Sequence, residues 1–215
     1  TIMNTIIKRQ KDKCFLIIPV LIILIAFSSC SNKDEQTRNN ASSEYQDETG
    51  LTVLSDDSLL DLVQKQTFKY FWDFAEPETG LTRERSQDLI TLTSGGTGFG
   101  IACFPVAVNR GWISRDQAIY QLKKILTFFE NADSYHGAFS HWYYKDGKTK
   151  SFSNLDDGGD IVETALLFQG LLINRQFFSQ DNDEEANLRN RITALWENVE
   201  WDWYTQGEKS ITWHW

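Results

Sequence analysis

The sequence has little cysteine, little proline and a deficit of positive charge. Its 215 residues include three cysteines and three prolines, and 21 lysines and arginines stand against 30 aspartates and glutamates. The formal net charge is -9 at pH 7. A chain this acidic is a poor ligand for nucleic acid, because both carry negative charge, so nucleic acid is not an expected partner.

Several of the basic residues lie at the N-terminus, ahead of an apolar run. Residues 15–27 form that run, two serines and Cys30 follow it, and four basic residues precede it: Lys8, Arg9, Lys11 and Lys13. This order predicts a secretory signal peptide over residues 3–29, with Met3 as the start. A membrane-spanning helix needs roughly 20 apolar residues. The run is shorter and contains Pro19, so cleavage fits it better than a permanent span.

Cys30 at the cleavage point resembles the lipobox of a bacterial lipoprotein, in which the thiol is lipidated and becomes the first residue. The alternative is an ordinary signal peptide followed by a chance cysteine. Residues 31–35 resemble the surface-export tag of Bacteroidetes lipoproteins, and the polar residues 30–54 predict a flexible tether. We therefore expect a cell-envelope protein, anchored to the outer membrane through Cys30. With Cys14 removed and Cys30 modified, Cys103 remains alone and no disulfide is expected in the mature chain.

Beyond residue 55 the chain alternates capped helical patterns with polar loops. Ser58 and Asp61 resemble a capping box that opens a first helix ending near Ala75. Ser114 and Gln117 form a second box ahead of a regular apolar stripe. Two further helices are expected, over residues 160–178 and 184–198.

The stretches between these helices carry weaker signals. Residues 79–94 have no clear periodicity, and residues 94–98 indicate a glycine-rich turn. Pro105 is expected to kink the apolar segment that follows or to lie in its first turn. Aromatic runs on both sides of Asp146-Gly147 predict a short hairpin within residues 135–152. No phosphate-binding loop is indicated, because the glycine-rich segment lacks a Lys-Ser/Thr ending and a preceding strand.

The most informative segment places acids at the start of an apolar helix. Asp160 and Glu163 are three residues apart and share one face, and Asp156 precedes them. A helix beginning near Gly158 favours ionised side chains there through its dipole and free N–H groups, while crowding of like charges raises one pKa again. A carboxylate held ionised suits a general base or a ligand for sugar hydroxyls better than a general acid. The alternative is that Asp157 or Asp160 is only an N-cap, with Glu163 completing a capping box.

Three motifs occur in one order: the glycine-rich segment 95–100, the aromatic run 137–144 and the stretch 160–178. Together they resemble the bacterial glycoamylase-like family, whose members include endo-β-1,2-glucanases. The resemblance covers residues 55–215. It implies an all-α fold, the (α/α)6 toroid built as a double ring of helical hairpins, here with one short β-hairpin. The chain holds fewer than half the helices of a closed toroid, so an incomplete ring is expected.

The resemblance also implies which residues act. Asp160, Glu163 and Asp156 are placed in the sugar cleft as catalytic candidates, without separate roles. The implied reaction is inverting and needs a second carboxyl group, which is expected beyond residue 215, where family members carry a further acid. Candidates for contact with the sugar are His141, Trp142, Tyr143, Trp213, His214 and Arg85. For each aromatic, core packing is the alternative, and Arg85 could instead pair with a neighbouring acid.

No metal or redox cofactor is indicated. His136, His141 and His214 lack ligand spacing with cysteine or glutamate. A calcium site on the loop 156–158 is conceivable, although the loop lacks the EF-hand period. We expect a monomer that hydrolyses a β-glucan, most simply a β-1,2-linked chain by endo action. Two alternatives stay open: an exo-acting glucosidase, and a lipid-anchored protein that binds glycans without cleaving them.

Overall fold

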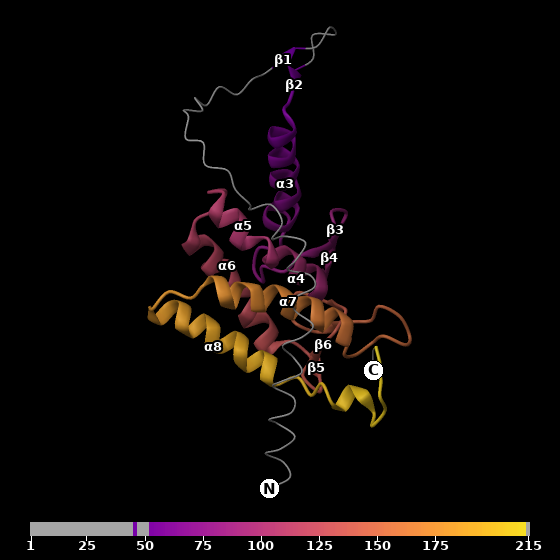
Figure 1. Cartoon of the computed structure of the whole chain (residues 1–215). Helices are drawn as coiled ribbons and strands as arrows, with labels where there is room; N and C mark the ends of the chain where they lie inside the picture. The colour runs from indigo at the N-terminus through magenta and orange to yellow at the C-terminus, as the bar shows by residue number, and fades with distance from the viewer. Residues whose placement is uncertain (1–44, 47–51, 214–215) are drawn as a thin grey trace. The chain divides into compact units, whose positions relative to one another are not determined.

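The computed structural model describes residues 45–46 and 52–213, with side chains from residue 54 onward. The described α-helices, labelled as in Figure 1, are α3 (Asp56–Asp73), α4 (Ser94–Ala102), α5 (Phe104–Asn109), α6 (Arg115–Asn131), α7 (Ile161–Phe177) and α8 (Asp183–Glu197). The strands are β1 (Tyr45–Gln46), β2 (Thr52–Val53), β3 (Arg83–Arg85), β4 (Asp88–Thr93), β5 (Ser134–Tyr135), β6 (Ala138–Phe139), β7 (Trp142–Tyr143) and β8 (Thr149–Lys150). A short 3-10 helix, Trp203–Thr205, follows α8.

The predicted signal peptide, Cys30 and most of the predicted tether lie outside the described residues. Within the part that is described, no helix combines the length and the apolar character that crossing a bilayer requires.

Helix α3 begins about one turn before the position that the sequence predicts. Ser55 has extended backbone, and its hydroxyl accepts a hydrogen bond from the Ser58 N–H at 3.3 Å, so Ser55 is the N-cap. The predicted capping box of Ser58 and Asp61 is therefore wrong. With Ser55 as the cap, Asp56 and Asp57 lie in the first turn, where the helix dipole favours negative charge. This favours Ser55 over Ser58 as the N-cap.

A four-stranded antiparallel sheet, in the order β3-β4-β7-β8, was only partly predicted. The hairpin of β7 and β8 around Asp146-Gly147 is confirmed, and β4 adds to it with Leu92 opposite Tyr143. β5 and β6 form a second hairpin. Strands β3 and β4 were missed because β4 is mostly exposed in its first half and buried in its second, so no alternation marks it. The fold is thus helix-rich with a small sheet, and not all-α with one hairpin.

The glycine-rich segment forms helix α4 and not a turn, which corrects the prediction. Two glycines let α4 pack directly on α7. A Cβ on Gly98 would lie 2.2 Å from the carbonyl oxygen of Leu166, and a Cβ on Gly170 would lie 2.1 Å from the carbonyl oxygen of Gly98. Glycine is required here because two helix backbones touch.

The remaining helices follow their predictions. Ser114 caps α6, and its side chain and that of Gln117 bond each other's backbone N–H, so the predicted capping box is present. The whole predicted stripe of α6 is buried: Ala118, Ile119, Leu122, Ile125, Leu126 and Phe129. Helices α7 and α8 begin and end within one residue of the predicted bounds, and Pro105 lies in the first turn of α5.

One apolar core joins the helices and the sheet. It includes Phe68 of α3, Leu92 of β4, Leu122 of α6, Phe168 of α7 and Leu188 of α8. The core brings the N-termini of α4 and α7 to the β6–β7 segment, through hydrogen bonds from the Ser94 N–H to the His141 carbonyl (3.3 Å) and from the Asp160 N–H to the Phe139 carbonyl (2.9 Å). These helices and the sheet are consistent with part of the expected helical toroid.

Candidate active site

The N-terminus of α7 holds the first of the predicted acids. Asp160 is the N-cap, and its Oδ1 accepts hydrogen bonds from the N–H groups of Val162 and Glu163, both at 2.9 Å. The helix begins at Ile161, one residue after the predicted start at Asp160, and Gly158 lies outside it. The capping alternative therefore holds for one oxygen of Asp160, and the second oxygen remains for other contacts.

Glu163 does not complete a capping box, because its side chain turns towards α4. Its Oε2 accepts a hydrogen bond from the Gly95 N–H at 3.1 Å. A Cβ on Gly95 would lie 2.2 Å from that same oxygen, so a glycine is needed at the start of α4 for Glu163 to occupy this place. The close packing of α4 and α7 thus determines where Glu163 points.

His141, just before β7, joins the acids into one cluster. Its Nδ1 lies 3.0 Å from Asp160 Oδ2 and 3.2 Å from Asp156 Oδ2, and its Nε2 lies 3.9 Å from Glu163 Oε1. The ring of Phe152 stacks on the imidazole with centroids 4.1 Å apart, which fixes the plane of the ring. We call Asp156, Asp160, Glu163 and His141 the carboxylate cluster.

The surroundings give these groups different proton affinities. Burial raises the pKa of Glu163; His141 opposes this effect and Asp160 reinforces it. Burial acts in the same direction on Asp160, but hydrogen bonds from His141 and from the Glu163 N–H hold its pKa below the usual range. Burial lowers the pKa of His141, but Asp160 and Glu163 outweigh it and the pKa is raised. His141 therefore keeps its proton to higher pH than a free imidazole, between an Asp160 that ionises more readily and a Glu163 that ionises less readily than usual.

Only part of the cluster reaches the surface. A pocket of about 380 Å³, here called the carboxylate pocket, is lined by His141 and Glu163 together with the aromatic residues Phe99, Trp142 and Phe152. Asp156 and Asp160 do not line it, and their exposed fractions are 5% and 0%. Glu163 and His141 can thus touch a ligand, whereas Asp156 and Asp160 act on it through His141.

The predicted sugar-contacting aromatics have different positions. Trp142 is half-buried and lines the carboxylate pocket, where its contact with a sugar stays a prediction. Tyr143 is fully buried, and its hydroxyl donates to the Asp133 carbonyl at 2.6 Å, so the core-packing alternative is correct for this residue. Trp213 is largely exposed, and its Nε1–H donates to Asp160 Oδ2 at 3.2 Å, so it contacts the cluster directly.

Of the two other predicted contacts, Arg85 does not line the carboxylate pocket. Arg85 is exposed and forms a two-point ion pair with Glu84, with 2.7 Å between Arg85 Nη2 and Glu84 Oε1, so the neighbouring-acid alternative is correct for it. His214 lies outside the described residues. The pocket instead contains Glu84 itself.

Three residues of the cluster are close enough together to bind a cation, although the spacing of the histidines along the chain predicts no metal site. One ligand atom each from His141, Asp156 and Asp160 lies within 4.8 Å of the others. The short distances from His141 Nδ1 are those of N–H···O hydrogen bonds, and the raised pKa of His141 favours a proton at this position. We therefore assign the cluster to proton sharing. Within the described residues, Asp156 could bind a cation together with His141 and Asp160, and not together with residues 157 and 158 as the conceivable calcium site requires.

Of the aromatic residues that line the carboxylate pocket, sequence reasoning found only Trp142, and it also missed the role of one glycine. Phe99 on α4 is 55% exposed and Phe152 is exposed on the loop after β8, and both line the carboxylate pocket. An exposed phenylalanine inside the glycine-rich segment was the available signal for Phe99. The contact of Gly95 with Glu163 joins residues 68 positions apart, so no local pattern could reveal it.

We expect the contribution of His141 to stability to depend on pH. Its folded pKa lies above 6.5, so its proton stabilises the fold fully below pH 6.5, and this effect is lost as pH rises through the folded pKa. Asp160 acts with the opposite sign: its folded pKa lies below 3.8, so its contribution is present above pH 3.8 and lost as pH falls further. His141→Gln should therefore lower Tm by about 2–4 °C between roughly pH 4 and 6.5, and by less once the pH exceeds the folded pKa of His141.

Thermal unfolding of both proteins across this pH range measures the effect. His136→Gln is the matched control, because His136 pairs with the exposed Glu200 outside the cluster. A Tm difference that is the same at every pH would show that His141 acts through packing alone.

Known proteins are similar to this chain in sequence and in fold. No family model matches the chain. The chain is 44% identical over 184 residues to the exo β-1,2-glucooligosaccharide sophorohydrolase of Parabacteroides distasonis, a match of 82% of this chain and 25% of that protein. The chain thus spans about a quarter of this relative's length.

Solved structures give the same result. A glucoamylase-like protein of Bacteroides uniformis matches with a TM-score of 0.74 and 48% identity, over 77% of this chain and 41% of that one. The endo-β-1,2-glucanase of Chitinophaga pinensis, solved with sophorotriose and glucose, matches with a TM-score of 0.73 and 46% identity, over 76% and 41%. Identity this high, together with a shared fold, confirms the resemblance seen in the sequence. Over most of its length the chain is homologous to these glucoamylase-like and β-1,2-glucan-hydrolysing proteins of Bacteroidetes, and it corresponds to less than half the length of the structures it matches.

Proposed function

We propose that the protein containing this chain is a glycoside hydrolase that acts on a β-glucan, with β-1,2-linked glucan as the substrate and internal linkages as the point of attack. The observation that carries the proposal is Glu163, a carboxyl group of raised pKa at the wall of an aromatic-lined pocket, beside the ionised Asp160. Relatives that act on β-1,2-glucan support the linkage. Their names include both endo and exo action, so the mode of attack rests on the proposal alone.

Glu163 has the properties of the general acid. A carboxyl group must be protonated to donate to the leaving glycosidic oxygen, and burial keeps the proton on Glu163 to higher pH. The Gly95 N–H holds one carboxyl oxygen and leaves Oε1 for the substrate. His141 and Asp160 position the acid from behind. Trp142 and Phe152, whose rings meet at 69° with centroids 4.8 Å apart, offer apolar surface for a sugar face.

An inverting reaction also needs a base carboxylate, roughly 6.5–9.5 Å from the acid, to activate water. Asp156 and Asp160 are buried behind His141 and do not line the carboxylate pocket. Glu84, the other carboxylate that lines the pocket, is held in its ion pair with Arg85. We therefore assign the base to a residue outside 52–213.

The test is hydrolysis by the full-length gene product of linear β-1,2-glucan, with β-1,3- and β-1,4-glucans as comparisons. Reducing ends released from the β-1,2 chain alone support the linkage. Long oligomers among the early products mean endo action, and a single short product from the chain end means exo action. Binding of the glucan without any product would favour the glycan-binding alternative.

The same proposal includes a lipid anchor on Cys30, supported by the basic, apolar and small-residue order of residues 8–30. We expect Cys30→Ala to move the protein from the membrane fraction to the soluble fraction, because lipid chains provide the attachment. Fractionation of cells, together with metabolic labelling by a radioactive fatty acid, measures this. Cys103→Ala is the matched control and should keep the label. Labelling that survives Cys30→Ala would contradict the anchor.

A further inference from the structure

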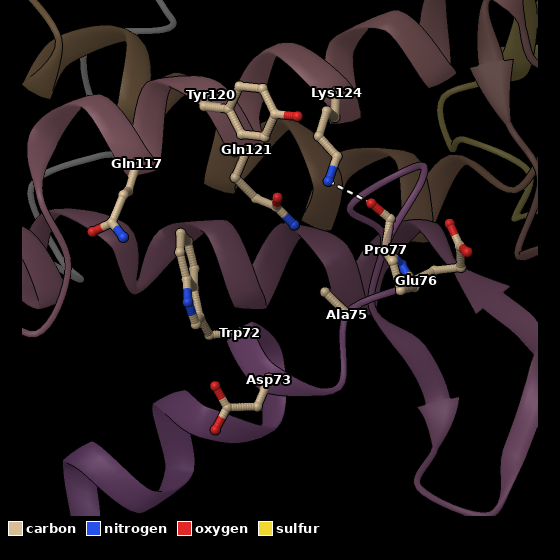
Figure 2. A pocket seen from close by; sticks show the side chains of 9 residues that line it. All are labelled: Trp72, Asp73, Ala75, Glu76, Pro77, Gln117, Tyr120, Gln121 and Lys124. Atoms are coloured by element: carbon tan, nitrogen blue, oxygen red, sulfur yellow. Dashed lines mark hydrogen bonds between the residues drawn. The ribbon is translucent and has the colours of Figure 1, made fainter.

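A second cavity of about 380 Å³ lies between the end of α3 and one face of α6 (Figure 2). Helix α3 contributes Trp72 and Asp73, the following loop contributes residues 75–77, and α6 forms the opposite wall. No lining residue is shared with the carboxylate pocket, which receives Tyr70 and Phe71 from the same turn of α3. The two pockets are therefore separate sites, and different residues of the same turn of α3 line each of them.

The α6 wall is a helix face distinct from the buried stripe. Its residues recur at the spacing i, i+3, i+4 and i+7, and they are Gln117, Tyr120, Gln121 and Lys124. All are polar or aromatic, and Tyr120 is 65% exposed. Packing of the core does not explain them, since the apolar stripe of α6 lies on its other side; Gln117 also has a structural role, because its Oε1 accepts from the Ser114 N–H in the capping box. An exposed aromatic ring flanked by amide side chains suits a sugar, whose apolar face stacks and whose hydroxyls form hydrogen bonds.

The walls of this pocket are held in place before any ligand binds. Lys124 Nζ donates to the Pro77 carbonyl, the dashed line in Figure 2, and ties α6 to the loop. Gln121 Nε2 donates to the Gly80 carbonyl at 3.3 Å, which leaves its Oε1 to accept from a ligand. Trp72, at one edge of the pocket, packs against the apolar core. A preformed pocket loses little conformational entropy on binding.

Asp73 supplies an acceptor at a position that weakens its own helix. It is the last residue of α3, where the helix dipole disfavours negative charge, and the last turn carries no basic residue to offset it. The pocket's second acid, Glu76, is buried and its Oε2 accepts from the N–H groups of Glu78 and Thr79, so Lys124 on the opposite wall balances Asp73, the acid that a ligand can reach. The pocket therefore suits a neutral ligand with many hydroxyl groups.

We propose that this α3–α6 pocket is a second, non-catalytic saccharide-binding site, which holds a glucan chain on the enzyme away from the carboxylate pocket. The saccharide class follows from the pocket itself, and its identity as β-1,2-glucan rests on the proposed function.

The test compares Tyr120→Ala and Asp73→Asn with their parent in native gels that contain linear β-1,2-glucan. Both side chains are exposed, so the fold is retained. All proteins carry Glu163→Gln to prevent turnover of the polymer. We expect the parent to be retarded, and its affinity to fall roughly fivefold to tenfold in each variant. Tyr144→Ala, an exposed tyrosine outside both pockets, is the matched control and should migrate as the parent does.

Hydrolysis of a short soluble oligosaccharide by Tyr120→Ala, without Glu163→Gln, should proceed at the wild-type rate. Equal retardation of Tyr120→Ala and its parent, or no retardation of the parent, would overturn the second site. Retardation by a different polysaccharide that Tyr120→Ala abolishes supports the site and contradicts only the proposed linkage. Failure of the wild type to hydrolyse any glucan contradicts the proposed function, while the gels still report on the α3–α6 pocket.

Discussion

Glu163→Gln is expected to lower kcat on β-1,2-glucan at least about a hundredfold, the scale of losing a general acid. The substitution keeps the shape of the side chain and an oxygen that can accept from the Gly95 N–H, so the change removes the proton and little else. A substrate with a good leaving group, such as a nitrophenyl glycoside of the same disaccharide, needs little protonation. Its hydrolysis should fall much less than that of the polymer.

The pH profile gives a second measure of the same assignment. With the pKa of Glu163 raised, kcat/KM of the wild type should decline as pH rises through that pKa, because the acid loses its proton. This alkaline limb should be absent in Glu163→Gln. Asp157→Asn is the control, because Asp157 is exposed and does not line the carboxylate pocket. Wild-type rates in Glu163→Gln would refute the role of Glu163.

Asp160→Asn separates the cap from the charge. Asparagine is as good an N-cap as aspartate, so α7 should keep its start while His141 loses its ionised partner. Because Asp160 is buried behind His141, its effect on the rate should pass through that residue. The losses in Asp160→Asn and His141→Gln should then fail to add in the double variant.

Gly98→Ala is expected to destabilise the protein by about 2–3 kcal/mol, through overpacking of the contact between α4 and α7. The added Cβ would lie 2.2 Å from the carbonyl oxygen of Leu166 and 2.6 Å from its carbonyl carbon. Both are backbone atoms, so the two helices must separate. In an isolated helix the same change would stabilise by about 1 kcal/mol, so the sign of the effect tests the close approach. Activity should fall as well, because the bond from Gly95 to Glu163 joins the same two helices.

Chemical or thermal denaturation measures this change, with an expected fall in Tm of about 5–10 °C. Gly96→Ala is the matched control in the same helix. Its Cβ would first meet the hydroxyl of Thr93, 2.2 Å away, and that side chain can rotate. A Gly98→Ala protein as stable as Gly96→Ala would show that α4 and α7 are not in backbone contact.

The local parts of the fold could be predicted from the sequence. The capping box of Ser114 and Gln117 and the apolar stripe of α6 are properties of neighbouring residues, and the structure agrees with them. The acids of residues 156–163 and their place at the start of a helix were predicted for the same reason. The family could be recognised too, because it rests on the order of several motifs along the chain.

The tertiary structure decided what those residues do. Whether a glycine-rich segment turns or packs as α4 depends on α7, and the partner of Glu163 lies 68 residues away at Gly95. From the sequence, Asp156, Asp160 and Glu163 were equivalent catalytic candidates. In the structure Asp156 and Asp160 are buried behind His141 and act as positioning acids, whereas Glu163 reaches the carboxylate pocket. Hydrogen-bonding and helical signals act over three or four residues, so the sequence alone determined the elements and the acids in them. Proton affinity and access to a ligand depend on distances in space, and only the packed structure sets these.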